Sequence, residues 1–186
     1  GKAFVNLLPI EPGDSIMNVL PLPEDETTWG DYDIMFATSS GDVRRNKLSD
    51  FATVNRAGKI AMKLPEGVEL VGVRMATVDD DVMLVTASGR AIRFPTTDVR
   101  IFKGRDSTGV RGIRLAPGEE VVSLVVPDGE GDILTASERG YGKRTPLDQY
   151  PKKGRGTQGV IAIQTTERNG KLVGAIQLSE QHEVLL

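Results

Sequence analysis

Three series of glycines recur along this chain at a nearly constant interval. The first series precedes strand-like stretches at intervals of 57, 51 and 50 residues, at Gly1, Gly58, Gly109 and Gly159. Two further series mark turns at similar spacing, and they comprise Gly13, Gly67, Gly118 and Gly170, and then Gly41, Gly89 and Gly140. A period of about 50 residues is typical of propellers and related arrays, in which each repeat is one small supersecondary unit. The chain is therefore predicted to consist of similar units placed side by side.

The local pattern inside each unit indicates β-strands. Residues 82–94, VMLVTASGRAIRF, are predicted to form two short strands around a Ser-Gly turn. Residues 121–126, VVSLVV, are a short apolar run that suits a buried strand, and the Asn169-Gly170 pair predicts a hairpin. Further strands are expected in KAFVNLL, KIAMKL, VRGIRL and VIAIQT, which follow the first glycine series. No stretch of twelve or more residues keeps a 3.6-residue period, so long helices are not expected.

These features predict an all-β fold, a propeller-like array of four-stranded blades. The 186 residues hold about 3.6 units in one partial domain. We expect a half blade over 1–31, blades over 32–80, 81–130 and 131–180, and the start of another at 181–186. Closed rings usually have about 4–8 blades, so the sequence is interpreted as a segment of a larger array. The longest glycine interval is explained by an acidic insertion at 21–30, which is expected to be a surface loop.

Charge is segregated in step with the repeat. The formal net charge of the chain is −3, which by itself argues against nucleic-acid binding. Three segments, however, carry net charges of +4, +5 and +5, at residues 42–63, 90–115 and 139–160, and the remaining residues sum to −17. A single cluster of this kind is usually a solvated face. Local fields decide phosphate affinity, so three basic segments at one per unit favour a basic rim.

Composition excludes several classes of site. The chain has no cysteine and one histidine, His182, which rules out disulfides, thiol catalysis and multi-histidine metal clusters. No apolar run approaches a membrane span, and no secretory signal pattern is visible, so we expect a cytoplasmic protein with no membrane partner. We find no nucleophile–base pair or phosphate-binding loop that would support an enzyme, and no cofactor is expected.

Several segments resemble the C-terminal domain family of DNA gyrase A. They span essentially the whole chain: FVNLLPIEPGD, MKLPEGVELVGV, STGVRGIRLAPGEEVVSL, LTASERGYGKRTPLDQYP and GVIAIQTTERNGKLVGAIQ. The resemblance implies a β-pinwheel of commonly six blades whose basic outer rim wraps DNA. It also implies a role in a bacterial type IIA topoisomerase that introduces negative supercoils, with the rest of gyrase A and with gyrase B as partners in a heterotetramer. ATP and Mg would act elsewhere in that assembly.

The signature box of that family, Gln-Arg-Arg-Gly-Gly-Lys-Gly, is absent here, and the resemblance implies that it belongs to the first blade, upstream of Gly1. Three basic loops look like its positional echoes: NRAGK at 55–59, KGRDSTGVRG at 103–112 and KKGRGTQG at 152–159. The last loop also contains a literal G-x-G-x-x-G. A dinucleotide fingerprint needs a following helix, and here a strand-like VIAIQ follows, so the loop is interpreted as a flexible backbone contact to phosphate.

Candidate phosphate contacts come from these loops and from one strand of each unit. Arg45, Arg93 and Arg144 align across the three units, and alternation along a strand predicts that this position faces outward. The alternative is an ordinary strand cation that pairs with a nearby acid. The full candidate set is Arg44, Arg45, Lys47, Arg56, Lys59, Arg93, Lys103, Arg105, Arg111, Lys143, Arg144, Lys152, Lys153 and Arg155.

Other conspicuous residues are interpreted as structural. Tyr32, Tyr141 and Tyr150 are expected to pack within blades, because none matches the context of a DNA-cleaving tyrosine. Residues 79–81 form an Asp-Asp-Asp run without the alternating ligand spacing of a calcium loop, which favours an acidic hairpin tip. Trp29 is expected to cover a blade edge.

Two functions remain in view at this point. A DNA-wrapping module without sequence preference would explain one basic segment per blade, and no base-reading constellation is apparent. A propeller-type protein-interaction scaffold would use the same fold but has no need of that periodic charge.

Overall fold

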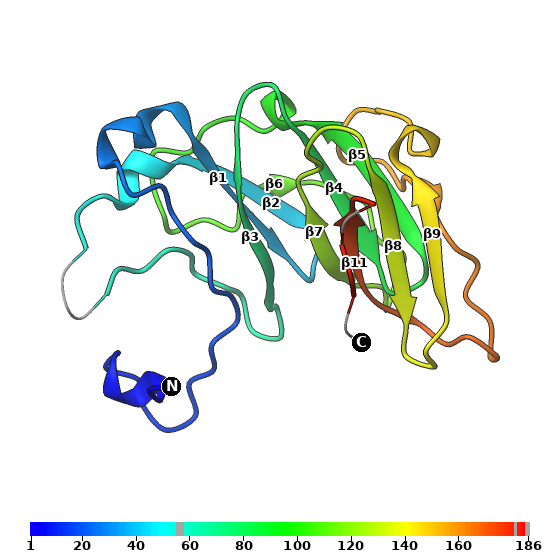
Figure 1. Cartoon of the computed structure of the whole chain (residues 1–186), viewed down its shortest axis with the longest axis horizontal. Coiled ribbons are helices and arrows are strands. Elements are labelled where there is room, and N and C mark those ends of the chain that lie inside the picture. The colour runs from blue at the N-terminus through cyan, green and yellow to red at the C-terminus, as the bar shows by residue number, and fades with distance from the viewer. Residues whose placement is uncertain (55–57, 181, 185–186) are drawn as a thin grey trace.

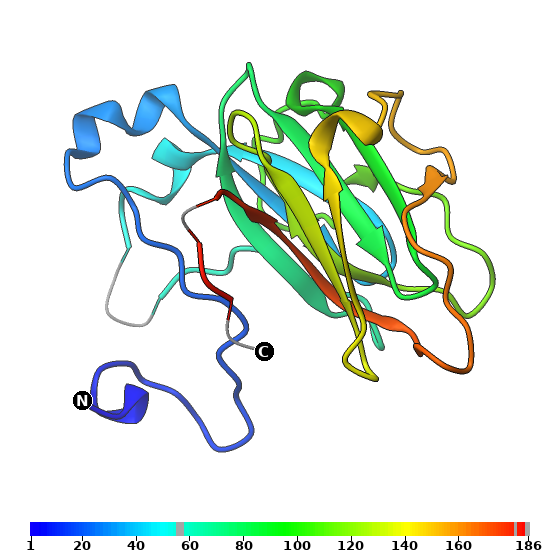
Figure 2. The same cartoon turned by 45° about the vertical axis from the view of Figure 1, so that its right-hand side comes forward.

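The structure is a computed structural model that describes residues 1–54, 58–180 and 182–184. Three antiparallel sheets stand one behind the other. The strands β3 (Leu70–Ala76), β7 (Val121–Val125) and β11 (Leu172–Leu178), one from each sheet, lie side by side along one edge (Figures 1 and 2). The all-β prediction is confirmed. No helix in the described ranges is long and apolar enough to cross a membrane.

Each sheet is built around a hairpin. The first sheet has the order β3-β1-β2-β6, with bounds Leu70–Ala76, Asp33–Thr38, Asp42–Lys47 and Val110–Arg111. The second has the order β10-β5-β4-β7, with bounds Val160–Ile161, Arg90–Pro95, Asp81–Thr86 and Val121–Val125. The third has the order β11-β8-β9, with bounds Leu172–Leu178, Asp132–Ser137 and Gly142–Pro146. The expected strands at 82–94 and 121–126 are thus present.

Short 3-10 helices occupy the connections. They are η1 (Phe4–Asn6), η2 (Glu26–Asp31), η3 (Leu48–Phe51), η4 (Thr96–Asp98) and η5 (Leu147–Gln149). The last three occupy the same place in successive units, because each follows the second strand of its hairpin. This repetition places the basic loops that come after η4 and η5 in equivalent positions.

The sheets exchange strands, which the predicted blocks did not anticipate. β6 lies within block 81–130 but completes the first sheet, and β10 lies within block 131–180 but completes the second. Blocks 32–80, 81–130 and 131–180 are therefore not self-contained sheets. The Asn169-Gly170 hairpin prediction is wrong for the same reason, since the strands on either side of that turn, β10 and β11, belong to different sheets.

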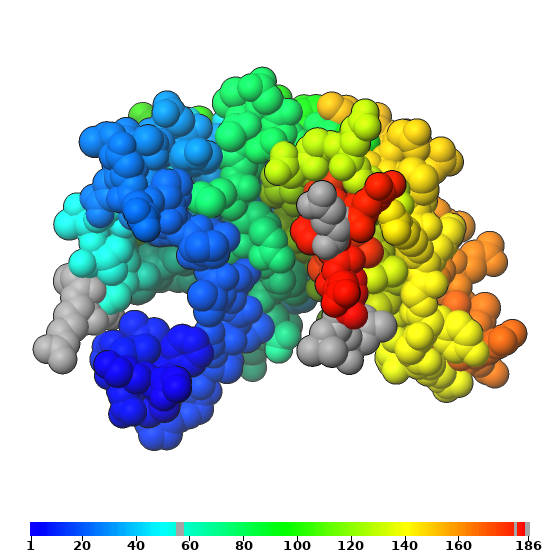
Figure 3. Space-filling view, viewed as in Figure 1, coloured from blue at the N-terminus to red at the C-terminus, as the bar shows by residue number. Residues whose placement is uncertain are grey.

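Other expected strands are shorter or absent in the described chain. VRGIRL and VIAIQT each contribute only two strand residues, after which the amides of Gly112 and Ile113, and of Ala162 and Ile163, converge on the carbonyls of Gly41 and Gly89. KIAMKL forms no regular element, and KAFVNLL forms η1 with exposed side chains. Figure 3 shows these first residues standing away from the sheets. A lone segment outside a sheet has no ladder partner, so it does not form a strand.

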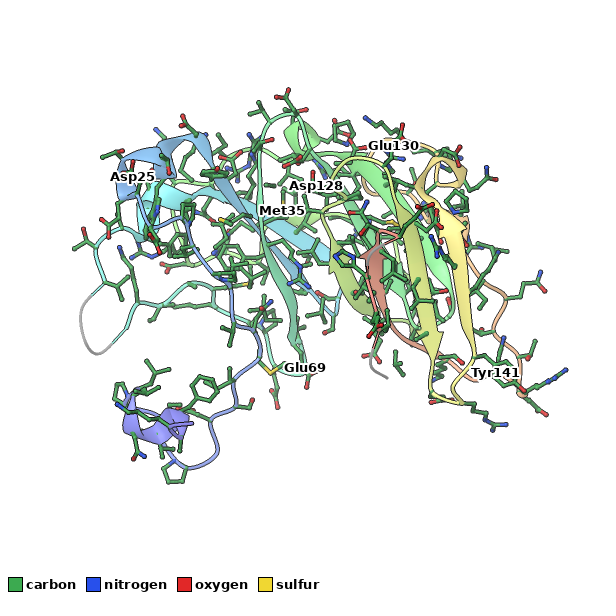
Figure 4. All side chains as sticks on the ribbon, viewed as in Figure 1. Asp25, Met35, Glu69, Asp128, Glu130 and Tyr141 are labelled. Atoms are coloured by element: carbon green, nitrogen blue, oxygen red, sulfur yellow. The ribbon has the colours of Figure 1, made fainter. Side chains whose placement is uncertain are left out.

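Two cores fill the spaces between the sheets. Met35, Val43, Leu84, Phe94 and Leu124 belong to the first core, which lies between the first and second sheets (Figure 4 shows Met35 in the interior). Met83, Val85, Ile133, Leu172 and Ala175 belong to the second core, between the second and third.

The burial patterns of the strands follow from these layers. β1 and β4 are buried at every position, because both sides of each sheet are covered. β8 instead alternates between buried and half-buried residues.

A third cluster covers the free side of the first sheet. Trp29 is 8% exposed, donates from its indole N–H to the carbonyl of Pro23 at 2.9 Å, and packs with Ile34, Phe36 and Leu48. Most residues of the insertion at 21–30 are exposed, as predicted for a surface loop, but η2 anchors the insertion to the first sheet through Trp29. Its aromatic residue is part of the core, a larger role than the edge cover expected from the sequence.

Candidate nucleic-acid interface

Two equivalent basic loops run along the outer edge of the array. Residues 102–109 lead from η4 to β6, and residues 152–159 lead from η5 to β10. Each loop begins with the same backbone bond to the preceding sheet, from Phe102 N to Arg45 O at 2.7 Å and from Lys153 N to Arg93 O at 2.9 Å. We call this edge, formed by the two loops with β6 and β10, the rim.

A glycine lets each loop lie directly on a strand. Gly109 and Gly159 have φ of +102° and +68°, and a Cβ at either position would collide with the carbonyl of Val43 or Ala91. Only glycine fits where the backbone is left-handed and the approach is this close. The G-x-G-x-x-G of the second loop therefore has a packing role at its last glycine, and the segment that follows begins as a strand, as predicted.

The expected outward position of Arg45, Arg93 and Arg144 is wrong for the first two residues. Arg45 is 5% exposed, and its guanidinium lies 2.6 Å from the carboxylate of Asp33. Arg93 is half-buried and pairs with Asp81 at 2.8 Å. Arg144 pairs with Asp132 but keeps half of its side chain exposed. The alternative interpretation holds for all three, because each arginine pairs with the first residue of the neighbouring strand.

These paired arginines also reach the next unit along the chain. Arg45 donates to the carbonyl of Val99 at 3.1 Å, and Arg93 donates to the carbonyl of Leu147 at 3.0 Å. Both carbonyls belong to the 3-10 turn of the following hairpin or to its end. Arg45 and Arg93 therefore link adjacent sheets, and we call each of them a latch.

Arg44 is buried as well, and its position removes it from any outer surface. It is 0% exposed, and its side chain donates to Asn46 Oδ1 at 2.7 Å and to backbone carbonyls. Burial, and next the nearby charge of Arg105, lowers the pKa of Arg44 from its ordinary value. No ion pair joins it to a carboxylate within the ranges that the structure describes.

Four further candidates are partly engaged by the protein. Lys47 Nζ lies 2.9 Å from Asp33 Oδ1. Lys152 Nζ lies 3.1 Å from Asp81 Oδ1, and 57% of the Lys152 side chain is exposed. Lys59 Nζ donates to two carbonyls at 2.9 and 3.0 Å, and Lys143 Nζ donates to Ala162 O at 3.2 Å. Each keeps some access to solvent. Arg56 lies outside the described residues.

Two arginines join the rim loops to their neighbours. Arg105 Nε donates to Ile60 O at 3.0 Å, and Arg155 donates to Asp98 O and Arg111 O, both at 2.9 Å. The backbone amide of Gly156 donates to Gly112 O at 2.6 Å. These bonds link the segment near residue 60, the first loop, β6 and the second loop into one continuous strip.

Lys103, Arg111 and Lys153 are exposed along this strip. None of the ion pairs found in the described part of the chain involves them. Sequence reasoning overlooked two neighbours in the same basic segment, Arg100 and Arg114, which are also exposed. The guanidinium of Arg100 stacks 3.7 Å from the ring centroid of Phe102. Both arginines lie within the basic segment 90–115, and membership of that segment could have identified them as candidates.

Acidic residues lie both within the rim and outside it, since Asp106 is exposed in the first rim loop itself. Asp128 and Glu130 lie at the turn between β7 and β8, and Figure 4 shows both near the upper ends of the strands, with Tyr141 near the lower end of β8 and β9. Asp79 and Asp80 belong to the expected hairpin tip, but Asp81 is 6% exposed and serves the ion pairs described above. Across the described ranges, no group of three or more His, Asp or Glu side chains could hold a metal ion.

The tyrosines differ in their surroundings. Tyr150 is 3% exposed within the second core, and burial raises its pKa above the ordinary value. Tyr32 packs against the third cluster, which agrees with the packing prediction. Tyr141 is 41% exposed and accepts a hydrogen bond from Arg168 at 3.0 Å, so the prediction of blade packing is wrong for this residue. His182 lies near the end of the chain and accepts from Ser179 N at 3.1 Å.

Known proteins share both the sequence and the fold. The chain matches the family model "DNA gyrase C-terminal domain, beta-propeller" over residues 32–77, 80–128 and 131–179. It is 46% identical over its full length to the DNA gyrase A protein of Escherichia coli (strain K12). It is also 46% identical, over 82% of the chain, to the DNA gyrase A protein of Pseudomonas aeruginosa. The chain spans about a fifth of the length of these relatives, 21% and 16% respectively.

Solved structures agree with these matches. A structure of the DNA gyrase A C-terminal domain aligns with a TM-score of 0.84 and 27% identity, covering 96% of this chain and 59% of that one. The C-terminal domain of DNA topoisomerase IV aligns with a TM-score of 0.86 at 23% identity, covering 97% and 55%, and supports the fold alone. The family model covers most of the chain, and the propeller-like arrangement of the sheets agrees with it. The chain therefore belongs to the DNA gyrase C-terminal domain family.

Proposed function

We propose that this chain binds duplex DNA along the rim, without sequence preference, and bends the duplex around its outer edge. The observation that carries the proposal is the continuous strip on which Lys103, Arg111 and Lys153 are exposed and unpaired with carboxylates in the described chain. Exposed cations of this kind neutralise phosphates and release counterions, which is the main source of sequence-independent affinity.

The free energy of the phosphate contacts must offset the cost of bending the duplex. Bending 20–30 base pairs by 40–90° costs on the order of 1–6 kcal/mol by elastic estimates. Rigid sheets suit this task, because the latches between them fix the relative positions of the loops before DNA arrives. Preference among sequences would then come from the ease of deformation.

In the longer protein, this binding would support ATP-dependent negative supercoiling by a DNA gyrase. The partners would be the remainder of gyrase A and the gyrase B protein in a heterotetramer, in the bacterial cytoplasm with the nucleoid. This domain would contribute no catalytic residue and no cofactor, and ATP and Mg would act in other parts of the assembly.

A charge-matched pair of variants tests the rim. Replacing Lys103, Arg111 and Lys153 with alanine should weaken binding of a mixed-sequence duplex and reduce the magnitude of the salt slope by about three. The control replaces Arg139, Arg168 and Lys171, which are exposed at the turn end of the third sheet, and changes the net charge equally. Fluorescence anisotropy against salt concentration measures both. Equal losses in the two variants would mean that overall charge, and no defined rim, binds the DNA.

A further inference from the structure

The first rim loop is held from beneath by a buried cation. Arg44 donates to the carbonyls of Arg105 at 2.9 Å and Ser107 at 2.7 Å, and also to that of Ala61. Its guanidinium carbon lies 4.7 Å from the ring centroid of Phe36. Backbone oxygens, an amide and an aromatic face thus contact this charge, and the charges of Arg105 and Asp106 on the same loop act on it with opposite sign.

Asn46 completes the arrangement from the same strand. It is 0% exposed, accepts from Arg44 Nε, and donates through Nδ2 to Phe102 O and Gly104 O, each at 3.0 Å. Four carbonyls of the loop 102–107 are therefore turned inward, onto two side chains of β2. We call Arg44 and Asn46 the clasp.

While the carbonyls of the loop are bonded to the clasp, its backbone amides at residues 103–108 have no backbone acceptor of their own among the described residues. Lys103 is exposed in the same stretch. Backbone amides next to a cationic side chain are the groups that bind phosphate oxygens in irregular loops.

The second sheet shows that a blade does not need the clasp to fold. Ile92 and Phe94 stand at the equivalent positions of β5, and both belong to the first core. The second loop is held differently, by its own Arg155 and by the pairing of Lys152 with Asp81. Burying a guanidinium costs free energy that an isoleucine avoids, so the clasp calls for a role beyond packing.

We propose that Arg44 is a positioning residue which, with Asn46, holds loop 102–107 in the conformation that receives one DNA phosphodiester group. Arg44 touches no phosphate itself; Lys103 and the loop amides make the contact. The inference rests on the proposed DNA binding and adds a preformed phosphate site to it.

The test compares the full chain with two variants. Arg44→Ile together with Asn46→Phe copies the second sheet into the first. Asn46→Asp is nearly isosteric, keeps Arg44 and removes the two donations to Phe102 and Gly104, so it provides a measurement if the double variant fails to fold. Trypsin cleavage after Lys103 and Arg105 reports release of the first loop, while cleavage after Lys152, Lys153 and Arg155 in the second loop is the internal control. Duplex affinity and its salt slope are measured on the same samples.

We expect faster cleavage in the first loop only, an affinity roughly tenfold lower at 0.1 M salt, and a salt slope smaller in magnitude by about one. Unchanged cleavage in variants with wild-type unfolding curves would overturn the clasp. Released loops with wild-type affinity and slope would overturn the phosphate site while DNA binding by the chain stands. Absence of duplex binding by the wild-type chain would overturn the proposed function and this inference together.

Discussion

The guanidinium of Arg45 lies 2.6 Å from the carboxylate of Asp33, and both side chains are buried where the first sheet meets the second. The same pair recurs as Arg93 with Asp81 and as Arg144 with Asp132, but exposure rises from the first to the third. The first two arginines also bind carbonyls of the following unit. The equivalent arginine thus lies in a different environment in each repeat, so its contribution to the free energy of unfolding differs from one repeat to the next.

Removing Arg45 should therefore cost far more stability than removing Arg144. Arg45→Ala leaves Asp33 buried with only Lys47 nearby, and loss of one partner from a buried pair typically costs about 3–5 kcal/mol. Arg144→Ala breaks a half-exposed pair worth about 0–1 kcal/mol. Urea unfolding monitored by circular dichroism measures the two free energies of unfolding. Equal losses would show that the latch does not depend on burial.

Two glycines of the second rim loop should differ in how much stability they lose on replacement by alanine. At Gly159, with φ of +68°, a Cβ would strike the carbonyl of Ala91. Gly159→Ala should lower the free energy of unfolding by about 1–3 kcal/mol or more. Gly154→Ala is the control, because nothing lies within 4 Å of the added carbon. We expect it to stay within about 0.5 kcal/mol of wild type. A neutral Gly159→Ala variant would contradict the close approach of the loop to β5.

Tyr150 should make the chain sensitive to alkali. Burial raises the pKa of its hydroxyl in the folded state, whereas in the unfolded chain the group ionises near pH 10. The unfolded state then binds fewer protons above that pH, so the free energy of unfolding falls as pH rises, by at most about 1.4 kcal/mol per pH unit. Tyr150→Phe should remove this contribution.

The control for Tyr150 is the variant itself at neutral pH. The hydroxyl lies near the Thr145 side chain but makes no hydrogen bond of good geometry among the described residues, so its removal should cost little there. Unfolding curves of both proteins from pH 8 to pH 11 provide the comparison. Parallel pH dependence in the two proteins would mean that Tyr150 stays ionisable in the folded state.

The sequence predicted the repeat from its glycine spacing, and it predicted the hairpin at 82–94 because that pattern is local. The Ser-Gly turn between β4 and β5 and the apolar run of β7 follow directly from short patterns. Strand exchange was not predictable in this way, because β6 and β10 complete sheets whose other strands lie far away in the chain. Two-residue strands such as Val160–Ile161 have no distinctive pattern of their own.

The candidate interface shows the same contrast between local and non-local features: the loop cations were predicted correctly and the strand arginines were not. Loop cations such as Lys103, Arg111 and Lys153 are exposed, as the basic loops suggested. The strand arginines were misjudged because alternation along a strand assumes one solvated face. Here the face that carries Arg45 meets another sheet, and the face that carries Arg44 meets a loop. Only the stacking of sheets, a non-local property, shows that both faces are covered.

The salt dependence of duplex binding reports how many phosphates the rim neutralises. With about six phosphates engaged, the slope of log K against log salt should be about −5, and affinity should fall roughly 10³-fold between 50 and 200 mM salt. Mixed-sequence duplexes of equal length should give similar affinities, because the proposed contacts are to phosphates. Fluorescence anisotropy with the full chain measures both quantities. A steep slope shared by unrelated sequences is the predicted result. A slope near zero, or no binding at 50 mM salt, would contradict DNA binding along the rim.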